Sequence, residues 1–225
     1  TFYCVYLALV QSSWVLGGGM WAEMASNYYP NSISDSLWTR LFATDFGYVP
    51  LPQRLIGIVG SSFNLPAAAI PYFYTWSAVI LTGAMVGSFC LRPFRVLVQS
   101  DALRFVAVLA VILVADFQTR TYINFTYFGA FFIAIIVALA FVDRLNDPPW
   151  YAWFTPLLMI SKPSMFVLLP LILITAVVSR SRFRWIALAS TLAVFVQACS
   201  LLVNKSSVPS NSSQPFSMVE KLHAG

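Results

Sequence analysis

The chain has 225 residues and a formal net charge of +5, and 59% of its residues are hydrophobic whereas only 9% are charged. Soluble domains carry about 25% charged residues, so this composition, with a mean hydropathy of +0.77, excludes an ordinary soluble protein. The basic residues stand in short clusters between apolar runs, so the positive charge gives no argument for nucleic-acid binding. We expect an all-α, polytopic transmembrane bundle that contacts membrane lipids and binds no nucleic acid.

Cysteine and histidine usage limits the chemistry further. Cys4, Cys90 and Cys199 lie inside apolar segments, which argues against a disulfide framework. The single histidine, His223, stands in the polar tail, and no paired-aspartate motif is present. We therefore expect no cofactor and no divalent metal.

The ends of the sequence suggest a piece of a longer protein. The chain begins inside an apolar segment without methionine, and residues 204–225 form a polar stretch. Neither a basic leader nor a cleavage site precedes the first span. We expect an N-terminal portion of a larger membrane protein, with a transmembrane module over residues 1–203 and an outer loop or truncated tail over residues 204–225.

The apolar runs predict the membrane spans. A helix needs about 20 apolar residues to cross the hydrocarbon core of a bilayer. The segments that qualify, or nearly so, are 1–20, 67–91, 127–142 and 183–203. Residues 103–115 form a shorter apolar run, which can cross where neighbouring helices or a thinned bilayer help.

Residues 153–178 would read as one more span if Lys162 and Pro163 did not interrupt them. Proline disfavours helix in the residue before it, and a lysine at the bilayer centre costs at least about 2.5–3.5 kcal/mol. A turn at the membrane surface removes both penalties and leaves two short crossings. The alternative is a single kinked helix with Lys162 facing a cavity. We expect the turn, and hence about seven spans in all.

Arginines in short loops predict the orientation, because cytoplasmic loops carry an excess of basic residues. The two clusters are Arg92, Arg95 and Arg104, and Arg180, Arg182 and Arg184. With a turn at Lys162, both clusters and Arg144 lie on one face, which we take as cytoplasmic. The outer face then receives residues 21–54, 116–126, 161–163 and the tail from 204.

The first outer loop, residues 21–54, has the pattern of helices that lie flat on a membrane. Ser34 and Asp35 can cap a short helix. Its apolar face would consist of Leu37, Trp38, Leu41 and Phe42. A second amphipathic stretch, QRLIGIVGSSFNL, leads into the next span.

Three carboxylates stand in this loop. Glu23 follows the first span directly, where it is partly removed from water, and Asp45 lies in TDFGYVPL, where Gly47 and the prolines indicate a fixed turn. Helix capping explains Asp35. A solvated or turn-stabilising role remains the alternative for Glu23 and for Asp45.

This arrangement resembles the polytopic glycosyltransferases of the GT-C superfamily, which have an acidic residue after the first span, a long outer loop with flat helices, and short paired spans. The segments TDFGYVPLPQRLIG, TYINFTYF and ISKPSMFVLLPL resemble, in order, those of bacterial and phage members. These include the serotype-converting O-antigen glucosyltransferases and related uncharacterised membrane proteins. The resemblance covers most of residues 14–203.

The resemblance implies a reaction on the outer, periplasmic face of the bacterial inner membrane. Such enzymes move a sugar from a polyprenyl-phosphate carrier to a hydroxyl of a glycan, lipid or protein, with inversion. Glu23 matches the acidic general base, which must reach the acceptor hydroxyl within hydrogen-bond distance. Many members carry an adjacent acidic pair and this chain has one acid there, so Asp45 is the other candidate, as second carboxylate or as the base itself.

A lipid-phosphate donor needs cations at the headgroup level. The candidates are Arg54, Arg120 and Lys162, for which ordinary snorkelling to the interface is the alternative. Tyr48 and Asn124 are candidate sugar contacts. A multi-pass transporter or flippase of lipid-linked sugars is the rival function, and a structural subunit of a polysaccharide assembly complex is a third. The scarcity of ionisable residues within the spans favours the enzyme.

Overall fold

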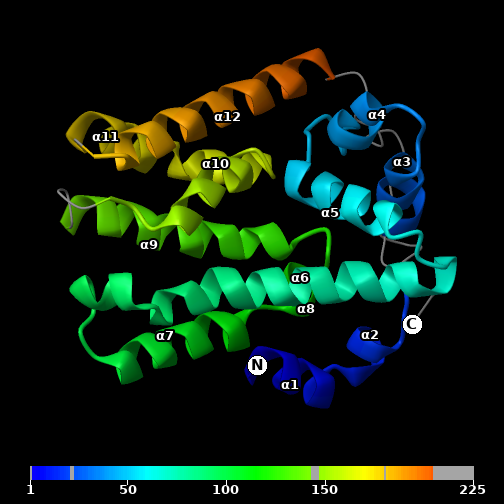
Figure 1. Cartoon of the computed structure of the whole chain (residues 1–225), viewed down its shortest axis with the longest axis horizontal. Helices are drawn as coiled ribbons and strands as arrows, with labels where there is room; N and C mark the ends of the chain where they lie inside the picture. Colours follow the sequence, from blue (N-terminus) through cyan, green and yellow to red (C-terminus); the bar gives the residue numbers. More distant parts are fainter. Residues whose placement is uncertain (1, 21–22, 143–146, 180, 205–225) are drawn as a thin grey trace, which may run out of the picture.

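A computed structural model describes residues 2–20, 23–142, 147–179 and 181–204 of the chain. Within these ranges the regular structure is helical, and the only β pairing is an isolated bridge between Asp45 and Tyr48. The longer helices lie side by side as a bundle, and three short segments, α3, α4 and α5, gather at one end of it (Figure 1).

The helices follow one another with short connections. The α-helices are α1 (Phe2–Val10), α2 (Ser12–Leu16), α3 (Tyr29–Ser32), α4 (Leu37–Phe42), α5 (Leu51–Ser62), α6 (Ile70–Gly87), α7 (Asp101–Val114), α8 (Phe117–Arg120), α9 (Phe128–Val142), α10 (Phe154–Met159), α11 (Leu169–Val178) and α12 (Phe183–Val203). A π-helical turn, η1 (Met24–Tyr28), precedes α3, and the 3₁₀ turns are η2 (Ala67–Ala69), η3 (Ser88–Cys90), η4 (Arg92–Val96), η5 (Phe125–Tyr127), η6 (Trp150–Trp153) and η7 (Pro163–Leu168).

Three helical segments of the described chain are long and apolar enough to cross a membrane. They are Ala67–Cys90, Phe125–Val142 and Phe183–Val203, and they confirm three of the expected spans. A bent pair of helices raises the number to four if the pair is counted as one span. The seven expected crossings are not confirmed.

The other expected spans are too short or broken. The expected span 1–20 is divided into α1 and α2 because the backbone leaves the helical conformation at Gln11 (φ −130°, ψ 41°). This break lies in the polar triplet Gln11–Ser13, which offers the backbone alternative hydrogen bonds. The expected span 103–115 lies in α7, which has 14 residues and is shorter than a full crossing requires.

The chain breaks at Lys162, as the sequence predicts. Trp150–Met159 and Pro163–Val178 are bent by 118° at this break. Such a bend fits a broken span or a re-entrant loop, so the turn at the membrane surface stays a prediction. Ser161 and Lys162 are nevertheless buried inside the protein, so the expected surface turn is covered by other parts of the chain.

The bundle has two chemically different ends. At one end, the arginine end, lie η4 with Arg92 and Arg95 and the α11–α12 connection with Arg182 (Figure 1). The opposite end, the loop end, is formed by residues 23–66. Both basic clusters thus lie at one end, as the turn implies. Arg144, Arg180 and the tail from residue 205 lie outside the described residues.

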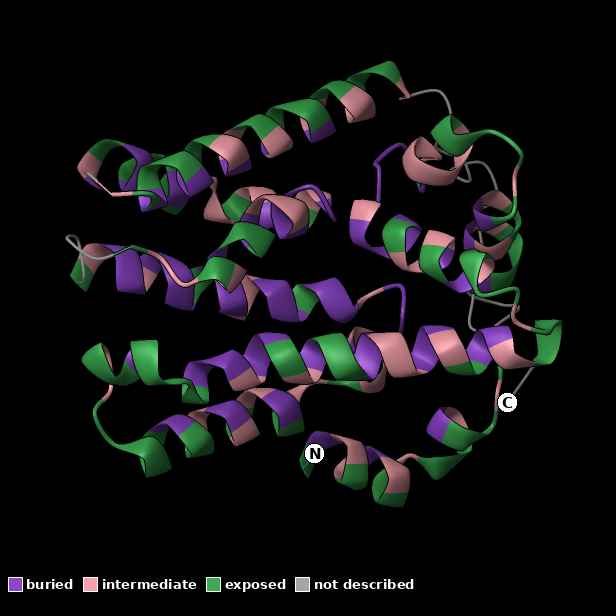
Figure 2. Ribbon diagram, viewed as in Figure 1, coloured by how far each residue is buried: buried purple, intermediate pink, exposed green. Residues whose placement is uncertain are grey.

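Burial follows the bundle arrangement. The facing sides of α6 and α9 are buried, whereas the outward faces are exposed although they are apolar (Figure 2). On α12, Leu192 and Phe195 are 62% and 65% exposed. Such outward apolar faces are typical of helices that contact lipid.

The loop end contains the two expected amphipathic helices, with one correction. The side chain of Ser36, and not Ser34 or Asp35, caps α4 by accepting a hydrogen bond from the Thr39 N–H at 3.3 Å. Ser36 lies directly before the first helical residue, so its hydroxyl is at the position that the free N–H groups require. Trp38 on α4 is 72% exposed, as an interfacial helix requires.

Candidate functional site

Polar side chains from three distant segments meet at the loop end, and we call this group the polar cluster. Its members are Glu23, Asn27, Tyr28, Asp45, Tyr48 and Arg54 from the first loop, Asn124 and Tyr127 from the α8–α9 connection, and Lys162 from the α10–η7 turn. Residues far apart in the sequence thus come together in space.

A tight hairpin turn presents Asp45 and Tyr48. The Asp45 N–H donates to the Tyr48 carbonyl at 2.8 Å, and the Tyr48 N–H donates to the Asp45 carbonyl at 3.1 Å. The two residues between them, Phe46 and Gly47, have φ of +48° and +85°. Positive φ at both central positions is the signature of a type I′ turn. The prediction of a fixed turn is therefore confirmed.

The Asp45 carboxylate is fully engaged by the protein. Oδ2 accepts hydrogen bonds from the Tyr28 hydroxyl at 2.7 Å and from the Tyr48 hydroxyl at 3.2 Å, and Oδ1 accepts one from Asn27 Nδ2 at 3.2 Å. The residue is only 3% exposed. With its oxygens bonded to three side chains of the protein and almost no exposed surface, Asp45 has little room to contact a ligand.

The two tyrosine donors stay protonated. Burial raises the pKa of Tyr28 and of Tyr48 far above the ordinary value, and the negative charge of Asp45 raises both further. A tyrosine next to a carboxylate can only donate while it keeps its proton. The pair is therefore a permanent hydrogen-bond donor set for Asp45.

Helix α12 holds the other side of this turn. Gln197, which is fully buried, accepts from the Val49 N–H through Oε1 at 3.0 Å and donates through Nε2 to the Val49 carbonyl at 3.4 Å. The Ser200 hydroxyl donates to the Gly47 carbonyl at 3.0 Å. These contacts, which we call the α12 clamp, join residues as far as 153 positions apart.

Lys162 is a buried cation beside this turn. The residue is 6% exposed, and its ammonium donates to Asn124 Oδ1 at 2.5 Å. The same nitrogen lies 4.8 Å from the centre of the Tyr127 ring and 6.0 Å from that of Tyr48. Asp45 also acts on it electrostatically, as does Glu23. Because a buried ammonium is costly unless compensated, these neighbours explain how the charge is tolerated.

Glu23 differs from Asp45 in its surroundings. It stands at the start of η1 and is half-buried, and its negative charge lies within electrostatic range of Lys162. A partly accessible carboxylate near a fixed cation can reach a ligand, whereas a buried one with three donors cannot. Of the two candidate bases, the geometry favours Glu23.

Arg54 holds the loop together from within. It is 2% exposed, and its Nε donates to the Ala43 carbonyl at 3.0 Å. One terminal nitrogen donates to Asn27 Oδ1 at 2.7 Å, and the guanidinium lies 4.8 Å from the centre of the Tyr28 ring. With these donors used inside the protein, Arg54 is not placed to bind a phosphate. The expected phosphate contact is not supported by this geometry.

Arg120 lies elsewhere in the fold. It donates to the carbonyls of Ile112 and Leu113 in the last turn of α7, at 3.0 and 3.4 Å, and its guanidinium lies 5.6 Å from the centre of the Tyr6 ring. A cation at a helix C-terminus satisfies free carbonyls and the helix dipole. These contacts give Arg120 a capping role, and none of them is with a member of the polar cluster.

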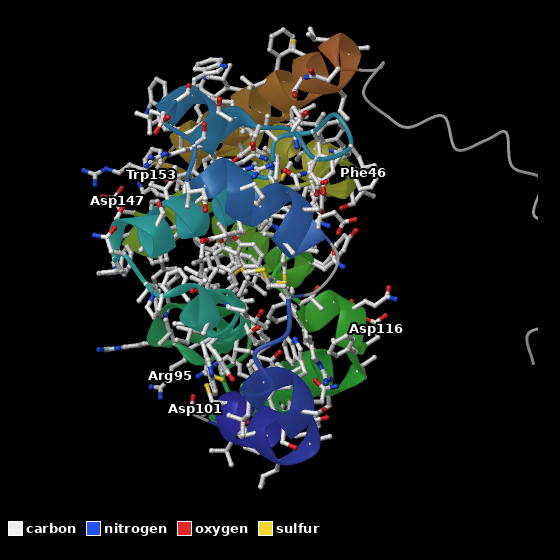
Figure 3. The ribbon with its side chains drawn as sticks, turned by 90° about the vertical axis from the view of Figure 1, so that its right-hand side faces the viewer. Phe46, Arg95, Asp101, Asp116, Asp147 and Trp153 are labelled. Atoms are coloured by element: carbon white, nitrogen blue, oxygen red, sulfur yellow. The ribbon has the colours of Figure 1, made fainter. Side chains whose placement is uncertain are left out.

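A large apolar groove lies on the opposite side of α5. It has a volume of about 900 Å³ and is lined by α5, α6, α9 and α10. Pro52, Ile56 and Val59 recur along the groove face of α5, whereas Arg54 lies on the far face of the same helix. Seen from the loop end, Trp153, next to the groove, and Phe46, next to the polar cluster, lie on opposite flanks (Figure 3).

The structure thus brings most of the candidate residues together. Glu23, Asp45, Tyr48, Asn124 and Lys162 meet in the polar cluster, and Arg54 lies behind them. Sequence reasoning missed Asn27, Tyr127 and Gln197. Only Gln197 carries a signal in the sequence, because a glutamine within an apolar span needs a polar partner.

Searches of protein-family models, of curated proteins and of solved structures found no match to this chain.

Proposed function

We propose that this chain is part of a bacterial inner-membrane glycosyltransferase of the GT-C type. In this proposal the enzyme moves a sugar from a polyprenyl-phosphate carrier to a hydroxyl of a glycan, lipid or protein, and the loop end faces the periplasm. The observation that carries the proposal is the half-buried Glu23 carboxylate within electrostatic range of the buried Lys162 ammonium, which Asn124 holds in place.

The chemistry needs one base and one cation. Glu23 takes the proton of the acceptor hydroxyl as its oxygen attacks the anomeric carbon. The bond between that carbon and the phosphate oxygen breaks on the other face of the sugar, so the configuration inverts and polyprenyl phosphate leaves. Lys162 lies in a low-dielectric environment, where a cation stabilises the charge that develops on the leaving phosphate.

Asp45 acts as a positioning residue in this scheme. Its charge orients the hydroxyls of Tyr28 and Tyr48 and acts on the Lys162 ammonium from within the protein. Without Asp45, the Tyr48 hydroxyl would lose its hydrogen-bond acceptor, and the Tyr48 ring next to Lys162 would be held less firmly. A residue of this kind affects catalysis through geometry.

The apolar groove supports a lipid carrier. With a volume of about 900 Å³ it lies within the range of sites that enclose small ligands. Its apolar lining suits an isoprenoid chain, and Phe125 of that lining adjoins Asn124, the hydrogen-bond partner of Lys162. A carrier in the groove would have to pass the η5 turn to place its phosphate at Lys162.

The test measures lipid-linked sugars in deletion cells that carry either no copy of the protein, the wild-type protein or a variant. Wild type should prevent the accumulation of one polyprenyl-phosphate sugar, measured by mass spectrometry of lipid extracts. Glu23→Gln should accumulate it as the deletion does, because an amide cannot accept the proton. Asp35→Asn is the matched control, since this exposed carboxylate lies in the same loop, and it should behave as wild type.

Full clearance of the lipid-linked sugar by Glu23→Gln, at wild-type protein level, would remove Glu23 as the base. If the deletion causes no lipid-linked sugar to accumulate, the proposed reaction itself is wrong.

A flippase of lipid-linked sugars is a second candidate, and one observation favours it. The helices that meet at Lys162 are broken and bent by 118° around a buried charge, which is a feature of transporters. The two functions predict that the lipid-linked sugar accumulates on different leaflets of the membrane. A flippase defect leaves the lipid-linked sugar on the cytoplasmic leaflet, whereas a transferase defect leaves it on the periplasmic leaflet, where an added membrane-impermeant oxidant modifies it.

A further inference from the structure

Phe46 adopts a backbone conformation that does not suit phenylalanine. Its φ is +48°, in the left-handed region where the Cβ atom of an L-residue crowds the following carbonyl. At the first central position of a type I′ turn, asparagine, aspartate and glycine are the favoured residues. Among the described residues with positive φ, the other non-glycine is Asn64, a residue type that tolerates this region. Backbone preference therefore does not explain the phenylalanine.

Core packing does not explain it either. Phe46 is 54% exposed, although its turn neighbours Asp45 and Tyr48 are 3% and 8% exposed. Seen from the loop end, Phe46 lies at the flank of the molecule (Figure 3). A half-exposed ring gains little from burial, so a residue with an easier backbone would stabilise the turn better.

The surrounding structure keeps the strained turn in place. Two backbone hydrogen bonds close it, and the α12 clamp fixes Val49 and the Gly47 carbonyl. A Cβ atom added at Gly47 would lie 3.4 Å from the Asn204 carbonyl oxygen, so Gly47 also packs against the end of α12. Strained residues that persist because the rest of the fold determines them are concentrated at functional sites.

We propose that the Phe46 ring stacks on the apolar face of a sugar ring of the substrate. The inference rests on the proposed function and names a contact residue within it. A pyranose presents a C–H face, which an aromatic ring covers, and a rim of hydroxyls. Phe46 stands between Asp45 and Tyr48, two members of the polar cluster. The half-buried Glu23 carboxylate of that cluster suits the hydroxyls of a sugar, which a purely apolar ligand such as a lipid tail does not offer.

The test is Phe46→Asn, which relieves the backbone and removes the ring. We expect a higher melting temperature in detergent, by several degrees, together with at least a tenfold loss of transfer. The donor is the lipid-linked sugar extract from deletion cells, and the acceptor is their envelope fraction. A raised KM for the donor extract assigns the ring to the donor sugar, and a raised KM for the acceptor fraction assigns it to the acceptor sugar.

Three further variants separate stacking from other roles. Phe46→Tyr and Phe46→Trp should restore transfer, because each keeps an aromatic face. Phe46→Leu keeps the apolar character alone and should remain impaired; wild-type transfer by Phe46→Leu would mean a contact with membrane lipid and would overturn the inference. Asn64→Gly is the matched control for a positive-φ site and should leave transfer unchanged.

The outcomes for the two proposals differ. If wild type transfers sugar and Phe46→Asn transfers it equally well, only the role of Phe46 falls. If wild type transfers no sugar from the extract, the proposed function falls, and this inference falls with it.

Discussion

The two ends of the bundle hold their charges in opposite ways. At the arginine end, Arg95 pairs with Asp101 and Arg182 pairs with Asp147, with side chains that are 56–69% exposed. At the loop end, Asp45, Arg54 and Lys162 are each at most 6% exposed. The arginine end has one exception, Arg104, which is buried and bonds to Asp101 and to the Val98 carbonyl.

This difference in the exposure of charged side chains indicates that the charges have different roles at the two ends. Exposed ion pairs contribute little to stability, so the arginine end gains little stability from its charge pairs. Buried charges are costly to desolvate, and removing one partner of such a group destabilises strongly. The loop end therefore maintains an arrangement that stability alone does not favour, which is the expected property of a functional site.

Asp45→Asn should give the largest loss of stability. The amide would face three hydrogen-bond donors with one acceptor oxygen, so about 3 kcal/mol of unfolding free energy should be lost. Unfolding in mixed micelles would measure it. Asp147→Asn, which changes an exposed carboxylate at the arginine end, is the control and should leave the melting temperature unchanged; equal losses would refute the contrast between the ends.

Gln197→Leu should have the next largest effect. It leaves the Val49 N–H and carbonyl buried without these partners, at a cost of about 1–3 kcal/mol. Transfer of sugar should fall as well, since the turn with Asp45 loses its support. Phe195→Leu, on the exposed face of α12, is the matched control. A Gln197→Leu protein with normal stability would show that the clamp contributes nothing.

Lys162→Met should separate stability from function. Removing the buried charge ends its desolvation cost but leaves Asn124 Oδ1 without this donor, so a loss of about 1 kcal/mol is expected. Transfer should fall by about 100-fold, as for the loss of one electrostatic stabiliser of a transition state. A variant that is unfolded, or one that is folded and fully active, would each contradict this expectation.

The smallest expected effect is the pH dependence of stability that Tyr28 and Tyr48 of the polar cluster cause. Their pKa values are raised by burial and then by Asp45, so the folded state holds its protons more tightly than the unfolded state does. Their contribution to stability is complete below about pH 10 and is lost as the pH rises above it. Tyrosinate absorbance should show that these two hydroxyls ionise only when the protein unfolds. Tyr28→Phe should reduce the dependence of stability on pH above about pH 10.

Much of this architecture was predictable from the sequence. Uninterrupted apolar runs gave Ala67–Cys90, Phe125–Val142 and Phe183–Val203, and the Lys162–Pro163 pair indicated the turn. The predicted topology also placed Asp45, Asn124 and Lys162 on one face, and the structure brings them together. Helix α5 also followed from its amphipathic pattern.

The remaining features depend on long-range packing. Hydropathy averages over the polar triplet at Gln11 and so counts two short helices as one span. The sequence places Arg120 and Lys162 on one predicted face, but only the fold shows that Arg120 caps α7. Likewise, no local pattern connects Gln197 with Val49, because their contact spans 148 positions.

The α12 clamp has a consequence for biogenesis. A chain enters the membrane in the order of its synthesis, N-terminal segments first. The loop that carries Asp45 is made early, yet the glutamine and serine that fasten it arrive only with the last described helix. A ribosome-bound intermediate would therefore expose an unfinished, inactive cluster until α12 is inserted.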